Sequence, residues 1–155
     1  MAAVTYQVEP WSVVWPELRI LLDDHWQEIA LDKETIALDM DLDAYAALEA
    51  AGVLHVITAR AARALVGYHV SVVRTHLHYR TSLTLFEDLY YLQPAYRRGW
   101  TGVRLFRAVE AHARTLGVQR MSATCKIHYK HGRIRRLFAR LRWTATEYVF
   151  TKILR

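Results

Sequence analysis

The sequence contains a single cysteine, Cys125, among its 155 residues. One thiol excludes a disulfide within the chain and a zinc site built from several cysteines. No apolar run approaches the roughly 18 residues of a membrane span. The opening MAAVTYQVEPW has neither a basic start nor an apolar signal core. We therefore expect a cytoplasmic protein.

Repeats, low-complexity tracts and Gly/Ser-rich linkers are also absent. We therefore expect a single domain that spans residues 1–155. This length is sufficient for a substantial hydrophobic core. A hydrophobic content of 53% with 23% charged residues is typical of an ordinary globular protein.

Acidic residues are scarce after residue 50, and basic residues are scarce before it. Residues 1–50 hold eleven Asp and Glu against two Lys and Arg, a net charge of −9. Residues 51–155 hold four against nineteen, a net charge of +15. This division favours a protein that meets a cation with one part and an anion with the other. Attraction between the two halves, or between two copies, explains it equally well.

The spacing of apolar residues predicts a mixed α/β (α+β) fold. Its central sheet has an antiparallel N-terminal half and one parallel β-α-β crossover, with flanking helices. Ser12 is a candidate N-cap, and residues 31–42 are expected to form an acidic loop. The predicted strands are 4–8, 53–59, 64–75, 82–92, 118–125 and 146–154. The predicted helices are 12–30, 43–52, 102–116 and 132–141.

Residues 94–106, PAYRRGWTGVRLF, join a predicted strand to a predicted helix through a turn that contains two glycines. Unpaired N–H groups and the positive end of the helix dipole make such a junction suitable for an anion. Arg97, Arg98 and Arg104 add positive charge. Taken alone, this pattern is common, and it is neither a Walker loop nor a GxGxxG motif.

The longer run LYYLQPAYRRGWTGVRLFRAVEAHARTLGVQRM, residues 89–121, resembles the acetyl-CoA-binding core of the GNAT superfamily of N-acetyltransferases. The family motif Q/R-x-x-G-x-G/A falls on Arg97, Trp100 and Gly102, with tryptophan at the place of the middle glycine. Gly99, one position earlier, offers the permissive backbone instead. The order of predicted elements agrees with the family, and the sequence resembles members carried by phages and prophages.

The resemblance implies a set of cofactor-binding residues. In the family, backbone N–H groups of the loop hold the CoA pyrophosphate, and the end of the preceding strand binds the pantetheine arm and the thioester carbonyl. A free N–H directed at that carbonyl would stabilise an oxyanion. The implied residues are Tyr91, Leu92, Gln93, Arg97, Arg98, Gly99, Trp100, Thr101 and Gly102.

Catalytic groups are less clearly marked. In the family, a tyrosine of the last helix often serves as the acid, but Phe138 stands at that place. Tyr129, Tyr90, Tyr91 or water are the alternatives. Glu87 and Asp88 are the only acids between residues 50 and 109. A carboxylate in an apolar strand is unfavourable unless it forms an ion pair or takes part in catalysis. Glu87 and Asp88 are therefore candidate bases, and an ion pair with an arginine is the alternative.

Several other residues are candidates for the acceptor side. His25 and Glu28 lie one helical turn apart on the first predicted helix, which borders the acceptor cleft in this family. His76 and His78 can face one side of an extended segment, and Tyr90 lies on the strand of the candidate base. Ordinary surface or structural roles explain each of them as well. We expect no metal site.

A basic segment, residues 126–142, holds seven Lys and Arg and no acid. It is suited to the CoA phosphates, to nucleic acid or simply to solvent. Cys125 is more typical of a buried structural thiol than of a nucleophile.

The expected function is transfer of an acetyl group from acetyl-CoA to a primary amine, on a small cationic molecule or a protein, by direct transfer. The alternative is a non-catalytic module of the same fold that binds CoA or RNA. The resemblance also agrees with a homodimer, because dimers are common in that family. The acceptor itself is not indicated by any motif.

Overall fold

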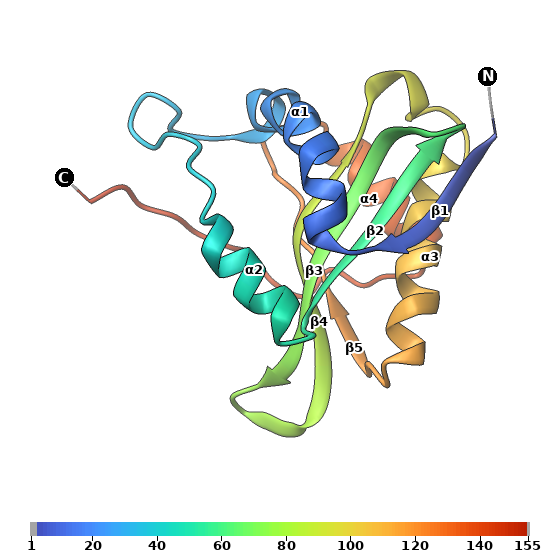
Figure 1. The fold of residues 1–155 in the computed structure, drawn as a ribbon. Helices are drawn as coiled ribbons and strands as arrows, with labels where there is room; N and C mark the ends of the chain where they lie inside the picture. The colour runs from blue at the N-terminus through green and yellow to red at the C-terminus, as the bar shows by residue number, and fades with distance from the viewer. Residues whose placement is uncertain (1–2, 155) are drawn as a thin grey trace.

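A five-stranded sheet in the order β1-β2-β3-β4-β5 forms the centre of the molecule (Figure 1). The computed structural model describes residues 3–154. The first four strands pair antiparallel, and β5 pairs parallel with β4. The predicted fold class is therefore confirmed. The strands are β1 Val4–Glu9, β2 Leu54–Ala61, β3 Ala64–His76, β4 Tyr79–Leu92 and β5 Arg120–Ser122.

Helices cover both faces of the sheet. Leu18 and Leu22 of α1 pack against Tyr68 and Val70 on one face, where α2 adds further apolar contacts. The α3 helix buries a second apolar stripe, which includes Val109, against the other face. Figure 1 shows α1 and α3 on opposite sides of the sheet. The helices are α1 Trp11–Ile29, α2 Leu42–Ala50, α3 Thr101–Thr115 and α4 His131–Arg140, with a short 3-10 turn, η1 Pro94–Tyr96.

The start of α1 differs from the prediction. Pro10 occupies the N-cap position, and Ser12 lies inside the first turn. The N–H of Ser12 donates to the carboxylate of Glu49 on α2 at 3.3 Å, which ties the two helices together. At α2 the cap is a side chain, because Asp41 accepts from the N–H of Ala44 at 2.9 Å.

Two predicted strands are corrected. The predicted strand 118–125 is only Arg120–Ser122 in the structure. The N–H of Thr124 donates to the Glu87 carboxylate and therefore takes no part in backbone pairing with β4. The predicted strand 146–154 is wrong: this segment has no regular secondary structure. A segment rich in β-formers becomes a strand only where a neighbouring edge pairs with it, and no described strand lies beside this one.

A β-bulge interrupts the pairing of β3 with β4. Val70 lies opposite Leu89 and Ser71 lies opposite Glu87, so Asp88 has no partner residue. The extra residue breaks the two-residue alternation of the strand. Glu87 and Asp88 contact different groups: Glu87 accepts from Thr124 after β5, and the extra residue Asp88 accepts from Tyr45.

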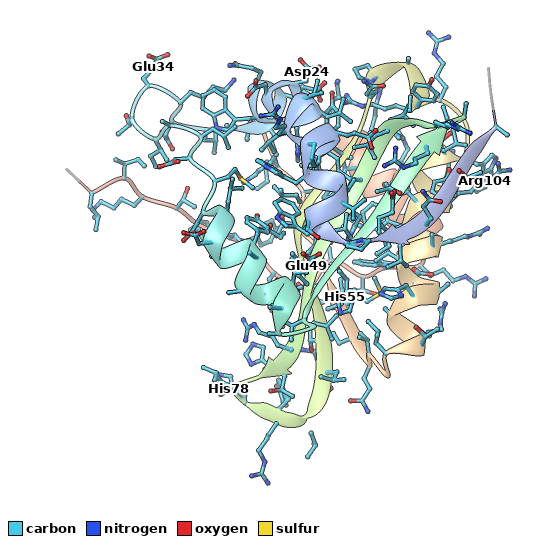
Figure 2. All side chains as sticks on the ribbon, viewed as in Figure 1. Asp24, Glu34, Glu49, His55, His78 and Arg104 are labelled. Carbon is cyan, nitrogen blue, oxygen red and sulfur yellow. The ribbon has the colours of Figure 1, made fainter. Side chains whose placement is uncertain are left out.

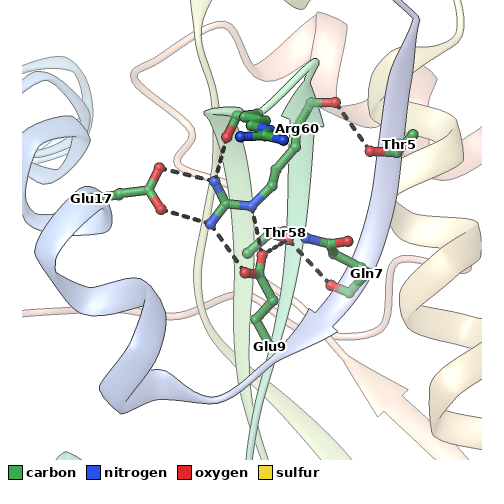
Figure 3. Close-up of polar contacts among 7 residues, drawn as sticks. Thr5, Gln7, Glu9, Glu17, Thr58 and Arg60 are labelled. Carbon is green, nitrogen blue, oxygen red and sulfur yellow. Dashed lines mark hydrogen bonds and ion pairs between the residues drawn. The ribbon is translucent and has the colours of Figure 1, made fainter.

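Arg60 clamps α1 to the sheet (Figure 3). Its guanidinium donates to the carboxylates of Glu9 on β1 and Glu17 on α1 at 2.8–3.1 Å, and to the carbonyl of Arg63. Burial alone would raise the pKa of Glu9, but hydrogen bonds from Arg60 and Thr58 hold it below 4.5. The hydrogen bonds from Arg60 likewise lower the pKa of Glu17. This fork–fork pairing fixes the position of α1.

None of the helices in residues 3–154 has the length and apolar character needed to cross a membrane.

Candidate active site

The parallel strands β4 and β5 stay together for only three residue pairs. Thr84, Leu85 and Phe86 pair with Arg120, Met121 and Ser122, and beyond these pairs the strands diverge. The chain after β5 remains linked to β4 through side chains, since the hydroxyl of Tyr90 donates to the carbonyl of Thr124 at 3.0 Å. The diverging strands leave the backbone edge of β4 without a strand partner next to Glu87 and Tyr90.

The N–H of Leu92 belongs to this free edge. The N–H of the next residue, Gln93, donates to Val66 of β3 at 2.9 Å. Adjacent backbone N–H groups of a strand point to opposite edges, so the Leu92 N–H points away from β3. The Leu92 carbonyl accepts from the Nε of Arg97. A donor is therefore available on the side where β5 has separated.

Glu87 lies at the point of divergence. Its Oε2 accepts from the N–H of Thr124 at 2.7 Å and from the Thr124 hydroxyl at 3.3 Å. Burial raises the pKa of Glu87 from its ordinary value of 4.5 to about 7, against the lowering effect of these two hydrogen bonds. A carboxyl group with this pKa both accepts and releases a proton near neutral pH.

Asp88 is exposed and faces the α2 side. Its carboxylate accepts a hydrogen bond from the hydroxyl of Tyr45. Burial, followed by the bond to Asp88, raises the pKa of Tyr45 well above 10, so the phenol remains a donor at physiological pH. Tyr45 stacks on Trp11 with ring centroids 4.3 Å apart, which holds the hydroxyl in place.

The predicted loop joins β4 to α3 as expected. Gly99 has φ +70°, and a Cβ at this position would meet no atom within 4 Å. A left-handed residue is needed here, and glycine adopts this conformation without strain. Thr101, Gly102 and Val103 form the first turn of α3, and no described group accepts from their N–H groups.

Trp100, the departure from the family motif, is the N-cap residue of α3. Its side chain is 54% exposed, and the guanidinium of Arg140 lies 5.4 Å from its ring centroid. The indole therefore projects to the surface. The Tyr6 hydroxyl donates to the Thr101 carbonyl at 3.0 Å and fixes the turn to β1.

Three residues predicted for different roles form one cluster. The Nη2 of Arg97 donates to both carboxylate oxygens of Glu28 of α1 at 2.8–2.9 Å. The Tyr129 hydroxyl donates to the same carboxylate at 2.8 Å and accepts from Lys130. Burial alone would raise the pKa of Glu28, but the bonds from Arg97 and Tyr129 hold it below its ordinary value. The cluster joins α1, the loop and the segment before α4.

His25 lies beneath this cluster. It is 4% exposed, and its Nδ1 lies 2.8 Å from the Tyr68 hydroxyl. Burial lowers the pKa of His25 to about 4, with smaller contributions from nearby charges, so the ring is neutral at physiological pH. Its ring centroid is 5.0 Å from that of Tyr91. His25 thus supports the end of β4 from inside the core.

His76 and His78 are not part of this region. They lie at the turn between β3 and β4, with ring centroids 5.2 Å apart. Figure 2 shows His78 at one end of the molecule and Asp24, the neighbour of His25 on α1, at the other. No cluster of three His, Cys, Asp or Glu with metal-binding geometry occurs in residues 3–154.

Apolar side chains surround Phe138, the position at which the resemblance would place the tyrosine acid. Phe138 packs on Phe106 and Trp143, with ring centroids 5.3 Å and 5.1 Å away, and its ring is 6.5 Å from Tyr90. Burial, followed by the charge of Glu87, raises the pKa of Tyr90 well above 10. Burial also raises the pKa of Cys125, which favours its neutral thiol.

Tyr45, Tyr68 and Thr124 were not anticipated from the sequence. Each of them holds a predicted residue in place, and each lies 37 or more residues from its partner along the chain. No local pattern marks such a pairing. For Thr124 the only signal was its position at the end of a predicted strand.

Two hollows of the described surface lie elsewhere. One of about 350 Å³ lies between β1 and α3 and is lined by residues that include Tyr6 and His112. A second of about 190 Å³ lies between α3 and β5 and is lined by residues that include Glu110 and Arg120. Neither hollow contains Glu87 or the loop before α3.

Solved structures share this fold at low sequence identity. Neither a protein-family model nor a curated protein matches the sequence. An aminoglycoside acetyltransferase from an uncultured soil metagenomic sample, in complex with trehalose, is 13% identical over 98% of this chain and 97% of that chain, with a TM-score of 0.75. Aminoglycoside N-acetyltransferase AAC(6')-Iy in complex with CoA is 15% identical over 100% and 97%, with a TM-score of 0.73.

A ribosomal-protein-alanine N-acetyltransferase from Brucella melitensis biovar Abortus 2308 is 15% identical over 98% of this chain and 99% of that chain, with a TM-score of 0.71. The same architecture therefore occurs in acetyltransferases with quite different acceptors. At these identities the likeness establishes the fold, which is the GNAT fold.

Proposed function

We propose that the protein is an N-acetyltransferase that transfers an acetyl group from acetyl-CoA to a primary amine. The observation that carries this proposal is the position of Glu87. A carboxyl group with a pKa of about 7 lies where β4 and β5 separate, on the strand that leads to the first turn of α3. The GNAT fold supports the proposal, because the structures named above are acetyltransferases.

The residues around the loop fit the phosphates of CoA. The N–H groups of Thr101, Gly102 and Val103 have no acceptor among the described residues, and Gly99 has open space around it. Arg98 and Arg104 are exposed beside them. The loop would therefore bind phosphate through its backbone, with arginine charge nearby. Arg97, already paired with Glu28, would instead hold the shape of the loop.

When bound, acetyl-CoA supplies an activated acetyl group as a thioester. Glu87 would take the proton from the acceptor ammonium, and its pKa suits this task near neutral pH. The Leu92 N–H would donate to the oxygen on which negative charge develops. Phe138 offers no proton to the departing thiolate, so we assign this role to Tyr129 or to water.

The acceptor side would favour a cation. Ten of the eleven acids of residues 1–50 follow Glu9, and they lie on α1, on α2 and in the loop between them. Figure 2 shows Asp24 and Glu34 on the side of the molecule where α1 meets this loop. Such a surface attracts a small cationic amine or a basic protein segment. Glu28 and Asp88 are the proposed acceptor-side carboxylates nearest to the loop and to the divergence point.

Calorimetric titration with acetyl-CoA tests the proposal. We expect binding that weakens roughly tenfold in Gly102→Pro, which removes one N–H at the second residue of α3. Gly132→Pro makes the same change at the second residue of α4 and serves as the control. Arg97→Ala is also expected to weaken binding. No binding at high micromolar acetyl-CoA, or equal affinity of the two proline variants, would refute the loop assignment.

Release of free thiol with a panel of polyamines, aminoglycosides and basic peptides tests the transfer itself. A second candidate, a non-catalytic module that binds CoA or RNA, is favoured by Phe138 at the place of the acid and by the exposed basic side chains of α4. Salt-sensitive RNA binding without thiol release would select the module.

A further inference from the structure

The hairpin formed by β3 and β4 carries arginines and aromatic rings without a single acid near its tip. Residues 51–86 contain no Asp or Glu. Figure 1 shows the tip of this hairpin extending beyond the ends of α2 and α3, and Figure 2 shows His78 on it. Arg74 is exposed, and the side chain of Tyr79 is 54% exposed. The tip is therefore open to a partner and attracts an anionic one.

Arginine and ring contacts connect the two strands and the neighbouring β5. The guanidinium of Arg74 lies 4.4 Å from the ring centroid of Phe86, and that of Arg120 lies 5.6 Å from the ring centroid of Tyr79. The ring of His76 lies between them, with centroids 6.1 Å from Phe86 and 5.7 Å from Tyr79. We call these five side chains the hairpin surface. They present ring faces and guanidinium groups side by side.

The two arginines of the hairpin surface keep their charge available. Neither Arg74 nor Arg120 forms an ion pair with a carboxylate of residues 3–154. An arginine that lies over a ring is oriented by the ring, and its N–H groups remain free to donate to a phosphate. The positive charge of this surface is therefore not neutralised from within the described chain.

A hollow continues the hairpin surface beyond Arg120. It has a volume of about 190 Å³ and is lined by residues that include Gln119, Arg120 and Arg114. A glutamine amide offers both a donor and an acceptor, which is the equipment needed to bind the edge of an unpaired base. The surface thus combines ring faces, free guanidinium groups and a polar hollow.

We propose that the hairpin surface binds single-stranded nucleic acid. Unpaired bases stack on aromatic rings, and the phosphates between them pair with arginine, so one ligand satisfies both kinds of group. An acidic peptide satisfies the charges but leaves the rings without a partner. RNA and single-stranded DNA share the required chemistry. The proposal is independent of acetyl transfer, because the hairpin tip is not part of the candidate active site.

Fluorescence anisotropy with a labelled oligouridine of about twelve nucleotides tests the proposal. We expect saturable binding at low salt that weakens as the salt concentration rises. Tyr79→Ala is expected to weaken binding roughly tenfold, because one base loses its stacking partner. Tyr148→Ala is the matched control, because Tyr148 is also exposed but lies on the C-terminal segment, and this variant is expected to bind normally.

The charge is tested separately. Arg120→Ala is expected to weaken binding and to reduce the slope of log affinity against log salt by about 0.7, the contribution of one phosphate contact on a single strand. Arg63→Ala, at the exposed turn between β2 and β3, is the control and should leave this slope unchanged. Oligothymidine of the same length identifies the source: preference for oligouridine indicates RNA, and equal affinity indicates that either strand is accepted.

Four results would overturn the proposal. The first is no binding of oligouridine at high micromolar protein. The second is equal affinity for a duplex of the same length, which would mean attraction by charge alone. The third is equally tight binding of an oligoglutamate, which would indicate an acidic protein partner. The fourth is loss of binding in the double variant Arg135→Ala, Arg136→Ala with normal binding in Tyr79→Ala and Arg120→Ala, which would assign the nucleic acid to α4.

Discussion

Replacing Glu87 by glutamine is expected to remove most of the activity and to stabilise the protein at the same time. The substitution keeps the size of the side chain and an oxygen that accepts from the N–H of Thr124 at the 2.7 Å position. It removes only the ionisation. The activity and the stability are affected in opposite directions because burial, which tunes the carboxyl group as a base, also penalises its charged form.

The magnitude follows from the pKa. A rise from 4.5 in the unfolded chain to about 7 in the folded one corresponds to about 3 kcal/mol. Because the folded pKa is the higher one, the folded state holds the proton more tightly. Stability is therefore fully present below 4.5 and is lost as the pH rises through about 7. Glu87→Gln should gain about 3 kcal/mol at about pH 8 and only about 1 kcal/mol near pH 5.

Urea denaturation followed by tryptophan fluorescence at both pH values measures the stability. Thiol release measures the activity, and kcat/KM of the wild type should rise with pH and level off above about 7. Glu87→Gln should lose about a hundredfold or more, together with this pH dependence. Asp88→Asn is the control, because its carboxylate is exposed, and it should show no comparable gain in stability at high pH.

Two results would refute this reasoning. Equal stability of the wild type and Glu87→Gln at both pH values would mean that the carboxyl group is not desolvated. A stability gain with unchanged kcat/KM would leave the burial correct and exclude Glu87 as the base.

Three further substitutions test the scaffold by urea denaturation. Arg60→Met is expected to cost about 2 kcal/mol of stability near neutral pH, because the carboxylates of Glu9 and Glu17 lose their partner. The folded pKa values of both carboxylates lie below 4.5, so this cost should vanish as the pH falls through those values. A cost that persists in acid would contradict this explanation. Gly67→Ala is expected to destabilise by about 2 kcal/mol, because its Cβ would come within 2.7 Å of the Tyr91 carbonyl oxygen, and an unchanged midpoint would show that β4 yields easily. His69→Leu is expected to stabilise by about 1 kcal/mol, because both ring nitrogens are buried without a partner among the described groups; a loss would indicate a partner such as a bound water.

Much of the fold was predictable from local patterns. The apolar spacing of residues 102–116 predicts α3 to within one residue, and strand 64–75 differs from β3 by one residue at its end. These elements are long and strongly periodic, so the local signal suffices. The loop before α3 was predictable because the two glycines and the following stripe lie within a single short stretch.

The rest depended on contacts between distant residues. No feature of residues 118–125 shows that the Thr124 N–H would leave the ladder for Glu87, and none of residues 146–154 shows that a partner strand is missing. The pairing of Arg97 with Glu28 joins positions 69 residues apart. For these features the tertiary arrangement outweighs local propensity.

The bulge at Asp88 makes this point of β4 tolerant of losing one residue. Loss of this one codon would place Glu87 next to Leu89 in a regular ladder, opposite Ser71 and Val70 as they are now, so both parts of the strand would keep their faces. Tyr45 would lose its acceptor, whereas Glu87 would stay beside Thr124. During evolution β4 can therefore lose a residue at the bulge, whereas a deletion elsewhere in the strand would turn one part of it to the opposite face.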